Sequence, residues 1–157
     1  MQNHRLENYL KNDLFEGIIG RQDYLTLYNA DALDKFNTVL ISIHDPGSMV
    51  HPDIKLQGFA DVLQIQFWDI EEAFGNYTPI TKEQGTEIRN FIERNSDKKF
   101  LIHCAAGQSR SAGTACAVEC IVNFNGSRYD YGTGSSDVKS HPRYSPNLTV
   151  FDAIIGD

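Results

Sequence analysis

The sequence of 157 residues predicts an α/β fold in which helices flank a central, mostly parallel sheet. Three short apolar runs, at 38–43, 62–67 and 99–103, have the composition and length of buried strands. Two longer segments with helical periodicity, at 82–95 and 111–124, follow the second and third runs. Because strands that alternate with helices form parallel sheets, we expect ligands to bind where the strands end.

Each predicted strand has a defined end. Thr38–Ile43 is an apolar run rich in β-branched residues that stops at an Asp-Pro-Gly turn signal. Val62–Phe67 alternates between apolar and polar residues and ends just before Asp69. Lys99–His103 leads directly into Cys104, which the sequence therefore places at the carboxyl edge of the sheet.

The two helices are supported by different signals. Thr81 and Gln84 form a capping-box pair in front of the segment Lys82 to Asn95, which has one apolar face. The segment Ser111 to Phe124 is apolar nearly all round, which predicts a buried helix. Gly126 is placed to end it.

Weaker patterns predict the remaining elements. They are a short helix carrying Leu6, Leu10, Leu14 and Phe15, a strand at 24–28, a helical turn or two at 31–36, a long loop at 125–146, and a helix at 148–155.

Composition limits the classes of function. The length fits a single domain spanning residues 1–157, and the net charge of −7 argues against binding to nucleic acid or to acidic membranes. No apolar run of signal-peptide or membrane-spanning type is visible. Three cysteines do not suggest a disulfide framework, so we expect a cytoplasmic protein with free thiols.

The segment from His103 to Ser111 has the residue types of a phosphate-binding loop. Ala105, Ala106 and Gly107 are small enough to let the backbone wrap closely around an anion. With Gln108 and Ser109, they would point backbone N–H groups at the phosphate. The following helix adds the positive end of its dipole, and Arg110 can donate two hydrogen bonds to phosphate oxygens.

The same donors act on Cys104. A helix N-terminus and a nearby cation favour the thiolate form of a cysteine, which is the nucleophilic form. Ser111, directly after Arg110, is placed to donate a hydrogen bond to the sulfur and so make it a better leaving group.

The pattern His103-Cys104, five residues, Arg110-Ser111, with Gly107 inside it, resembles the signature of the protein tyrosine and dual-specificity phosphatases. The resemblance extends over about Thr38 to Ile155, and residues 1–37 match poorly. It implies that family's fold and a hydrolase that needs no metal or cofactor and forms a phosphocysteine intermediate. It also implies that Cys104, Arg110 and Ser111 are catalytic.

A general acid is expected on the preceding strand end. Asp69 lies 35 positions before Cys104 (104 − 69), a separation similar to that of the acid in the resembling family. No proline follows Trp68, unlike in the tyrosine-specific members. Glu71 and Glu72 remain alternatives to Asp69 as the group that protonates the leaving oxygen.

Other residues are assigned to architecture. We interpret His103 as a residue that orients the loop by bonding backbone near Cys104. Pro146-Asn147 resembles the turn before the last helix of dual-specificity phosphatases. Cys116 and Cys120 are interpreted as small core residues, with a redox partnership to Cys104 left open.

The loop sequence also bears on the substrate. Phosphatases of inositol lipids usually place lysines inside this loop, and here positions 105–109 carry no charge. A phosphorylated protein or peptide is therefore the expected partner, with phosphotyrosine as the first candidate and phosphoserine or phosphothreonine as alternatives. A small-molecule phosphate stays open as substrate, as does the oligomeric state. The alternatives in function are a non-catalytic phosphate reader and a sulfur-transfer or arsenate-reducing enzyme.

Overall fold

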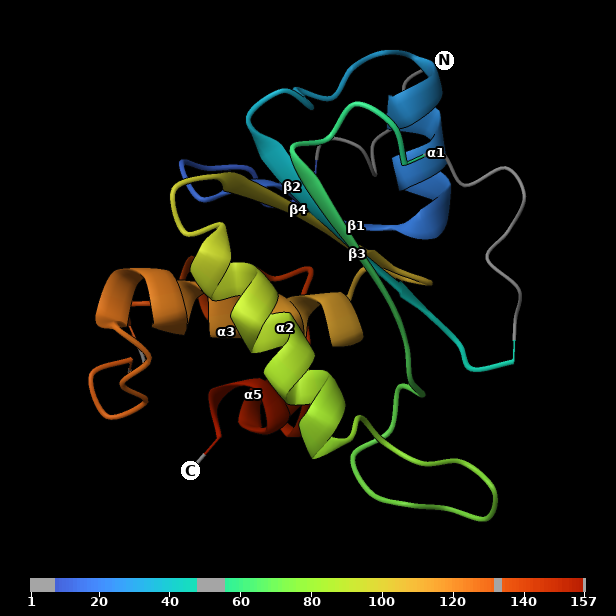
Figure 1. Ribbon diagram of the computed structural model, residues 1–157, viewed down its shortest axis with the longest axis vertical. Coiled ribbons are helices and arrows are strands. Elements are labelled where there is room, and N and C mark those ends of the chain that lie inside the picture. Colours follow the sequence, from blue (N-terminus) through green and yellow to red (C-terminus); the bar gives the residue numbers. More distant parts are fainter. Residues whose placement is uncertain (1–7, 48–55, 132–133, 157) are drawn as a thin grey trace.

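The computed structural model describes residues 8–47, 56–131 and 134–156 (Figure 1). Its centre is a four-stranded sheet in which every neighbouring pair is parallel, in the order β1-β4-β2-β3. The strands are β1 Phe15–Gly20, β2 Thr38–His44, β3 Asp61–Gln66 and β4 Lys99–Cys104. The helices are α1 Arg21–Asn29, α2 Lys82–Arg94, α3 Arg110–Phe124, α4 Asp137–Ser140 and α5 Leu148–Ile155. The predicted α/β class with a parallel sheet is confirmed.

The register brings the strand ends together. Gly20 of β1 is the partner of Cys104 on β4, and Ser42 of β2 is the partner of His103. On the other side of β2, His44 pairs with Gln66 at the end of β3. The carboxyl ends of all four strands therefore share one edge, which is where an open parallel sheet binds ligands.

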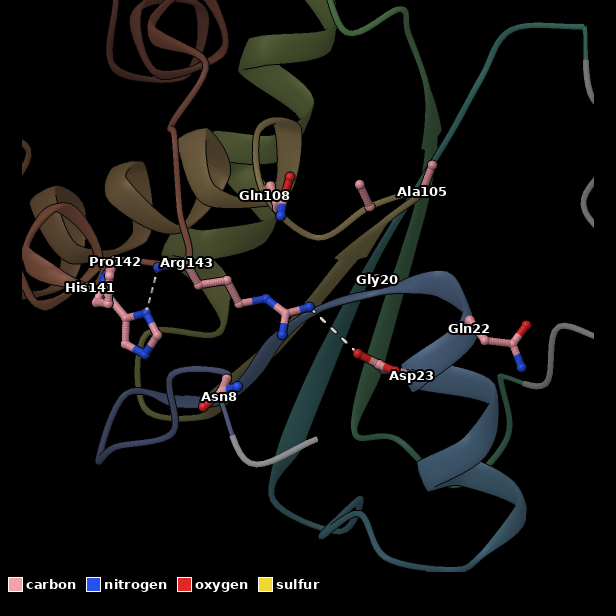
Figure 2. A pocket seen from close by; sticks show the side chains of 10 residues that line it. Asn8, Gly20, Gln22, Asp23, Ala105, Gln108, His141, Pro142 and Arg143 are labelled. Carbon is pink, nitrogen blue, oxygen red and sulfur yellow. Dashed lines mark hydrogen bonds and ion pairs between the residues drawn. The ribbon is translucent and has the colours of Figure 1, made fainter. Parts of the chain in front are cut away.

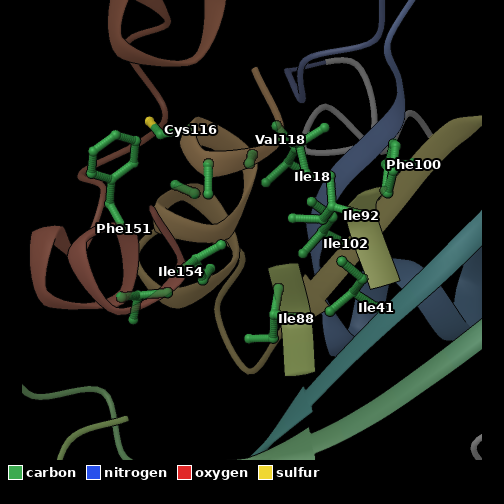
Figure 3. Packing of buried hydrophobic residues seen from close by; sticks show 14 of the residues in the cluster. Ile18, Ile41, Ile88, Ile92, Phe100, Ile102, Cys116, Val118, Phe151 and Ile154 are labelled. Atoms are coloured by element: carbon green, nitrogen blue, oxygen red, sulfur yellow. The ribbon is translucent and has the colours of Figure 1, made fainter. Parts of the chain in front are cut away.

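The two faces of the sheet are covered unequally. Helices α2, α3 and α5 lie together on one face, and α1 lies on the other (Figure 1). The three-helix face holds the main hydrophobic core, in which Ile41, Ile102, Ile88 and Val118 are all fully buried (Figure 3). The α1 face holds a small cluster: Ile19, Tyr24, Leu27, Leu33, Leu40 and Leu101.

The stronger sequence signals agree with the structure. The three predicted strands correspond to β2, β3 and β4 within one residue at each end, and the predicted helices correspond to α2, α3 and α5. Thr81 accepts a hydrogen bond from the Gln84 amide, and the Gln84 side chain accepts one from the Thr81 amide, so the capping box is present. The C-cap of α3 is Asn125 in a left-handed conformation, followed by Gly126 with φ 78°.

The predicted strand at 24–28 is wrong, because these residues lie inside α1. Asp23, Tyr24 and Leu27 are its buried residues, so the buried positions follow a helical rather than an alternating pattern. Aromatic and β-branched residues favour strands only where a neighbouring strand is available to pack against, and here the neighbouring β1 has already ended.

The predicted N-terminal helix is also wrong within the described residues. Residues 8–14 form bends and an Asn12-centred turn, and Phe15 begins β1. Leu6 lies outside the described residues. β1 pairs with β4 from Phe15 to Gly20, with a register shift at Glu16. It does so despite a glutamate and two glycines, because its burial and its main-chain bonds to β4 outweigh a weak intrinsic preference.

Two smaller differences concern connections. Residues 31–36 form turns and bends instead of helix. The loop predicted at 125–146 contains the one-turn helix α4, whose N-cap Ser136 accepts a hydrogen bond from the Lys139 amide. In the part of the chain that the structure describes, no helix is long and apolar enough to cross a membrane.

Candidate active site

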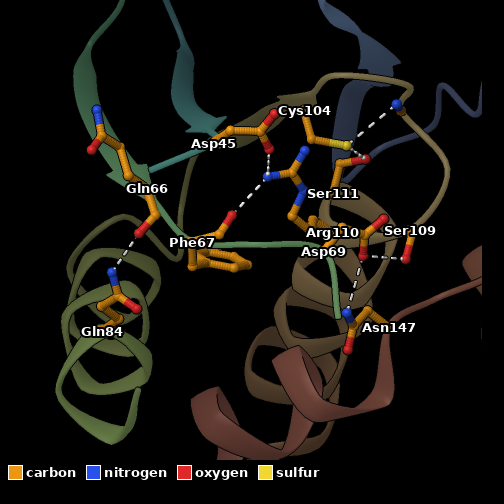
Figure 4. Close-up of polar contacts among 11 residues, drawn as sticks. Asp45, Gln66, Phe67, Asp69, Gln84, Cys104, Ser109, Arg110, Ser111 and Asn147 are labelled. Carbon is orange, nitrogen blue, oxygen red and sulfur yellow. Dashed lines mark hydrogen bonds and ion pairs between the residues drawn. The ribbon is translucent and has the colours of Figure 1, made fainter. Parts of the chain in front are cut away.

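The loop between β4 and α3 wraps around the sulfur of Cys104. Cys104 is the last residue of β4, and Arg110 is the first residue of α3. The Gly107 amide donates to Sγ at 3.3 Å, and Oγ of Ser111 lies 3.2 Å from Sγ (Figure 4). The sulfur therefore sits among hydrogen-bonding groups at a helix N-terminus, an environment that favours a thiolate.

Carbonyl groups of this loop are bonded on its outside. The Ala105 carbonyl accepts from the Arg21 amide at the start of α1, and the Gln108 carbonyl accepts from the Ser145 amide. The Ser109 carbonyl accepts from the Asn147 amide at 3.1 Å. A loop whose carbonyls are held outward has its N–H groups available on the inside, which is the geometry of an anion-binding nest.

Gly107 is required by this geometry. Its φ is 71°, in the left-handed region that favours glycine. A Cβ at this position would lie 2.3 Å from the Gly20 nitrogen and 2.3 Å from the Ile19 carbonyl carbon. The loop thus packs directly against the end of β1, and no side chain fits between them.

Arg110 is buried and held from one side. It is 4% exposed, and its Nη1 donates to Oδ1 of Asp45 at 2.8 Å and to the Phe67 carbonyl at 2.7 Å (Figure 4). Its Nε is buried and has no hydrogen-bond partner within the described residues. A buried guanidinium with an unsatisfied donor is costly unless an anion completes it.

Asp69 is fixed beside the loop by two neighbours. Its Oδ1 accepts from Oγ of Ser109 at 2.7 Å and from Nδ2 of Asn147 at 3.1 Å (Figure 4). Asn147 also caps α5, since its Oδ1 accepts from the backbone amides of the first turn. Asp69 is thereby held against the loop that carries Cys104, whereas Glu71 and Glu72 lie further along the same exposed stretch of chain.

His103 is fully buried behind Cys104. Its Nε2 lies 2.8 Å from Oγ of Ser42, and its ring stacks on Tyr24 with centroids 4.5 Å apart. Burial, with smaller contributions from His44 and Arg21, lowers the pKa of His103 to about 3, and a backbone hydrogen bond with Cys104 opposes this shift. The ring is neutral at pH 7, so its position favours an orienting role over proton transfer.

A cavity of about 700 Å³ opens beside the loop, between the loop, the start of α1 and the segment that follows α4 (Figure 2). Ala105, Ala106 and Gln108 of the loop line it. Across from them, Arg143 and Asp23 approach each other at 3.5 Å. The cavity is large enough for part of a substrate that extends out of the loop.

The two other cysteines lie buried on α3. Burial is the main cause that raises the pKa of Cys116 to about 11, and burial also raises that of Cys120. Both therefore remain thiols at neutral pH, in keeping with small core residues. Within the described residues, no group of three or more His, Cys, Asp or Glu side chains is placed to hold a metal ion.

Sequence reasoning missed the residues that support the loop from other elements. Asp45 was visible as part of a turn signal, Ser42 as a member of the predicted strand 38–43, and His44 as the residue that follows that strand. Asn147 was interpreted as a helix cap, although its amide also bonds Asp69. The contacts of Ser42 with His103, Asp45 with Arg110 and Asn147 with Asp69 join residues 61 to 78 positions apart. Only the register of the sheet and the packing of α5 reveal them.

This fold is that of the protein tyrosine and dual-specificity phosphatases, as three solved structures illustrate. DUSP15 is 24% identical, covering 94% of this chain and 86% of that chain, with a TM-score of 0.58. The human tyrosine phosphatase-like serine/threonine/tyrosine-interacting protein is 19% identical, covering 89% and 85%, with a TM-score of 0.53. PTPMT1 in complex with PI(5)P is 16% identical, covering 88% and 85%, with a TM-score of 0.50.

No protein-family model and no curated protein matches the sequence. At these identities the structural likeness establishes the fold alone. The chemistry depends on the residues of the site, because one fold can carry different functions.

Proposed function

We propose that this protein is a metal-independent phosphomonoester hydrolase that works through a phosphocysteine intermediate. The observation that carries the proposal is the placement of the Cys104 sulfur inside a loop closed by Arg110, whose buried Nε has no hydrogen-bond partner in the described part of the chain. A nucleophile at the centre of an anion-binding nest suits attack on a tetrahedral, negatively charged phosphorus centre.

In the first step the Cys104 thiolate attacks phosphorus, so that an S–P bond forms as the P–O bond to the leaving group breaks. Asp69, in its protonated form, gives its proton to the departing oxygen. Arg110 and the amides of residues 105–109 hold the other three phosphate oxygens throughout, which supplies positioning and charge stabilisation.

In the second step Asp69, now a carboxylate, takes a proton from a water molecule that attacks the phosphocysteine. The S–P bond breaks, inorganic phosphate leaves, and the sulfur departs as a thiolate. The Oγ of Ser111, 3.2 Å from the sulfur, is placed to donate a hydrogen bond to that developing charge. Asp69 thus ends the cycle protonated again.

The proposed substrate is a phosphorylated protein or peptide carrying phosphotyrosine, with phosphoserine and phosphothreonine as further candidates. PTPMT1, seen in complex with PI(5)P, shares this fold, so the fold by itself does not select proteins. The loop of this chain has no lysine to meet additional phosphates, which favours a singly phosphorylated side chain. Because a nucleophilic thiol must stay reduced, we also propose the cytoplasm as its compartment.

Phosphate release from p-nitrophenyl phosphate in the presence of EDTA tests the proposal, with wild type beside Cys104→Ser. We expect turnover in the wild type and none in the variant, because serine is not ionised at neutral pH. Vanadate should still bind the variant, since the amides and Arg110 remain. If wild type and variant bind vanadate and neither turns over, the protein is a phosphate reader and not an enzyme.

A further inference from the structure

A buried glutamate interrupts the apolar surface of α3. Glu119 is the one acidic residue in the sequence of this helix, and its side chain is 4% exposed. Burial of a carboxylate is costly unless hydrogen bonds replace those that it made to water. Its chain neighbours Val118 and Cys120 are buried core side chains, so packing of the core does not account for a charge at this position.

The carboxylate of Glu119 accepts four hydrogen bonds, and the donors come from the first turn of α4 and the chain just before it. Oε1 accepts from the Tyr131 hydroxyl at 2.7 Å and from Oγ of Ser136 at 2.6 Å. Oε2 accepts from the backbone amides of Asp137 at 2.9 Å and Val138 at 3.2 Å. A carboxylate offers about four lone-pair directions, so these bonds use its acceptor capacity.

The bonds to Glu119 fix a segment that has little regular structure of its own. Residues 136–147, which we call the strap, contain one helical turn, α4, and otherwise turns and irregular chain. A ladder of main-chain bonds therefore does not define the path of the strap, whereas directional bonds to a buried carboxylate do. Replacing buried charged groups by apolar ones is often neutral for stability, so Glu119 points to placement of the strap more than to stability.

The other end of the strap holds the proposed active site. The Ser145 amide donates to the Gln108 carbonyl at 2.8 Å, and the Asn147 amide donates to the Ser109 carbonyl at 3.1 Å. Nδ2 of Asn147 also donates to Oδ1 of Asp69 at 3.1 Å (Figure 4). The strap thus holds two carbonyls of the phosphate loop outward and keeps the candidate acid beside that loop.

We propose that Glu119 is a positioning residue, which anchors the strap and through it the phosphate loop and Asp69. Glu119 lies nine residues after Arg110 on α3 (119 − 110), about 14 Å along the helix axis, so it acts from outside the site. One helix therefore carries both parts: Arg110 closes the loop, and Glu119 fixes the strap. The effect on turnover rests on the proposed phosphatase activity, whereas the anchoring of the strap does not.

Amide hydrogen exchange, measured by NMR, compares the strap in wild type, Glu119→Met and Glu119→Gln. Methionine has a similar length and no carboxylate, so it removes all four bonds. Glutamine keeps one oxygen, which can still accept from the Asp137 and Val138 amides. We expect the Ser145 and Asn147 amides to exchange at least about tenfold faster in Glu119→Met, and within about threefold of wild type in Glu119→Gln.

Glu16→Met is the matched control. Glu16 is also a buried glutamate, 2% exposed, and it accepts a hydrogen bond from the Asp34 amide at 3.0 Å. It lies near the start of β1, whereas the strap contacts the loop at the carboxyl ends of the strands. The Ile102 amide in the central strand β4 reports global opening in each variant. We expect the ratio of Ser145 to Ile102 exchange rates to rise only in Glu119→Met.

Turnover then tests the consequence for the reaction. A strap that no longer holds Asp69 should matter more for a poor leaving group, which needs protonation, than for a good one. We expect Glu119→Met to lower kcat about tenfold on p-nitrophenyl phosphate and about a hundredfold on phenyl phosphate, the size of effect that slight misplacement produces. Glu119→Gln should recover most of this loss, and Glu16→Met should keep the wild-type ratio between the two substrates.

Unchanged exchange at Ser145 and Asn147 in Glu119→Met would refute the anchoring. Faster exchange there with an unchanged ratio between the two substrates would refute the positioning role. If Glu119→Met does not fold, Tyr131→Phe combined with Ser136→Ala takes its place, because it deletes two of the four donors; we expect the same changes at smaller size. If wild type is inactive and the exchange ratio still rises in Glu119→Met, the proposed function is rejected and the anchoring stands.

Discussion

The two faces of the sheet differ in the residue types that they bury. The face under α2, α3 and α5 is a continuous apolar core, and its buried residues on β4 are Phe100, Ile102 and Cys104. Among the residues that the structure describes, the face under α1 has six buried hydrophobic residues. Near the strand ends this face is polar, with Ser42, His44 and His103. One strand, β4, thus presents Cys104 to the apolar side of the sheet and His103 to the polar side.

The two faces therefore contribute differently: the apolar face mainly stabilises the fold, and the polar face mainly orients groups near the strand ends. A large apolar core contributes most of the hydrophobic stabilisation and holds α3 and α5, which carry Arg110 and Asn147. A small polar layer contributes little burial but has directional bonds, which can fix the orientation of a ring or a main-chain segment.

Asp69→Asn should lower kcat by roughly two to four powers of ten, since a general acid typically contributes that factor. The loss should be greater with phenyl phosphate than with p-nitrophenyl phosphate, because phenolate is the poorer leaving group. Steady-state kinetics with both substrates measure it. Glu71→Gln and Glu72→Gln serve as controls. If the Asp69→Asn enzyme were as fast as wild type, Glu71 or Glu72 would be the general acid instead.

Ile102→Ala and Leu101→Ala compare the two faces at adjacent positions of β4, both fully buried. Truncating a core leucine or isoleucine costs about 2–5 kcal/mol of the free energy of unfolding, depending on how far the site can relax. We expect Ile102→Ala near the upper end and Leu101→Ala near the lower end, because a single helix covers Leu101. Urea denaturation measures both. Equal losses would show that the α1 face is packed as tightly as the other.

The pH dependence of stability should come in part from His103. Its pKa is about 3 in the folded protein and about 6.5 in the unfolded chain, so the folded state binds fewer protons between these values. The neutral ring's contribution is present above pH 6.5 and is lost as the pH falls toward 3, at up to about 1.4 kcal/mol per pH unit.

His103→Gln removes this titration, so its free energy of unfolding should fall less steeply than that of wild type between pH 6 and 4. Urea denaturation at a series of pH values gives both slopes. Parallel slopes would mean that His103 titrates alike in the folded and unfolded states.

The smallest effects on stability are expected for Asn147→Ala and Thr81→Ala, of which only the first should also affect kcat. Each removes the side chain that caps a helix on the apolar face, α5 or α2, at a cost of about 0.5–2 kcal/mol of the free energy of unfolding. Only the Asn147 side chain also bonds Asp69. We therefore expect similar losses in thermal stability, with a fall in kcat for Asn147→Ala alone. A similar fall in both would assign the effect to stability.

The elements that could be predicted are those with a local cause. β2 and α2 are specified by an apolar run and by a capping box, both readable within about ten residues. The loop from Cys104 to Arg110 is equally local, since small residues, a glycine with positive φ and a helix start are consecutive in sequence. Residues 24–28 of α1 were mistaken for a strand because Tyr24, Thr26 and Tyr28 favour strands. The burial of Tyr24 and Leu27 on one side of a helix decides otherwise.

The sequence by itself predicted the α/β class, the parallel sheet and the phosphate-binding loop, because each follows from patterns that are local in the chain. Asp69 was predicted as the acid from its separation of 35 positions from Cys104 (104 − 69) and from the family resemblance. Tertiary structure alone decided that Asp45 bonds Arg110, that Asn147 and Ser109 hold Asp69, and that Ser42 lies between two histidines. Sequence separation carries no information on such contacts. Strand order and register set them, and these result from the packing of the whole core and not from any one segment.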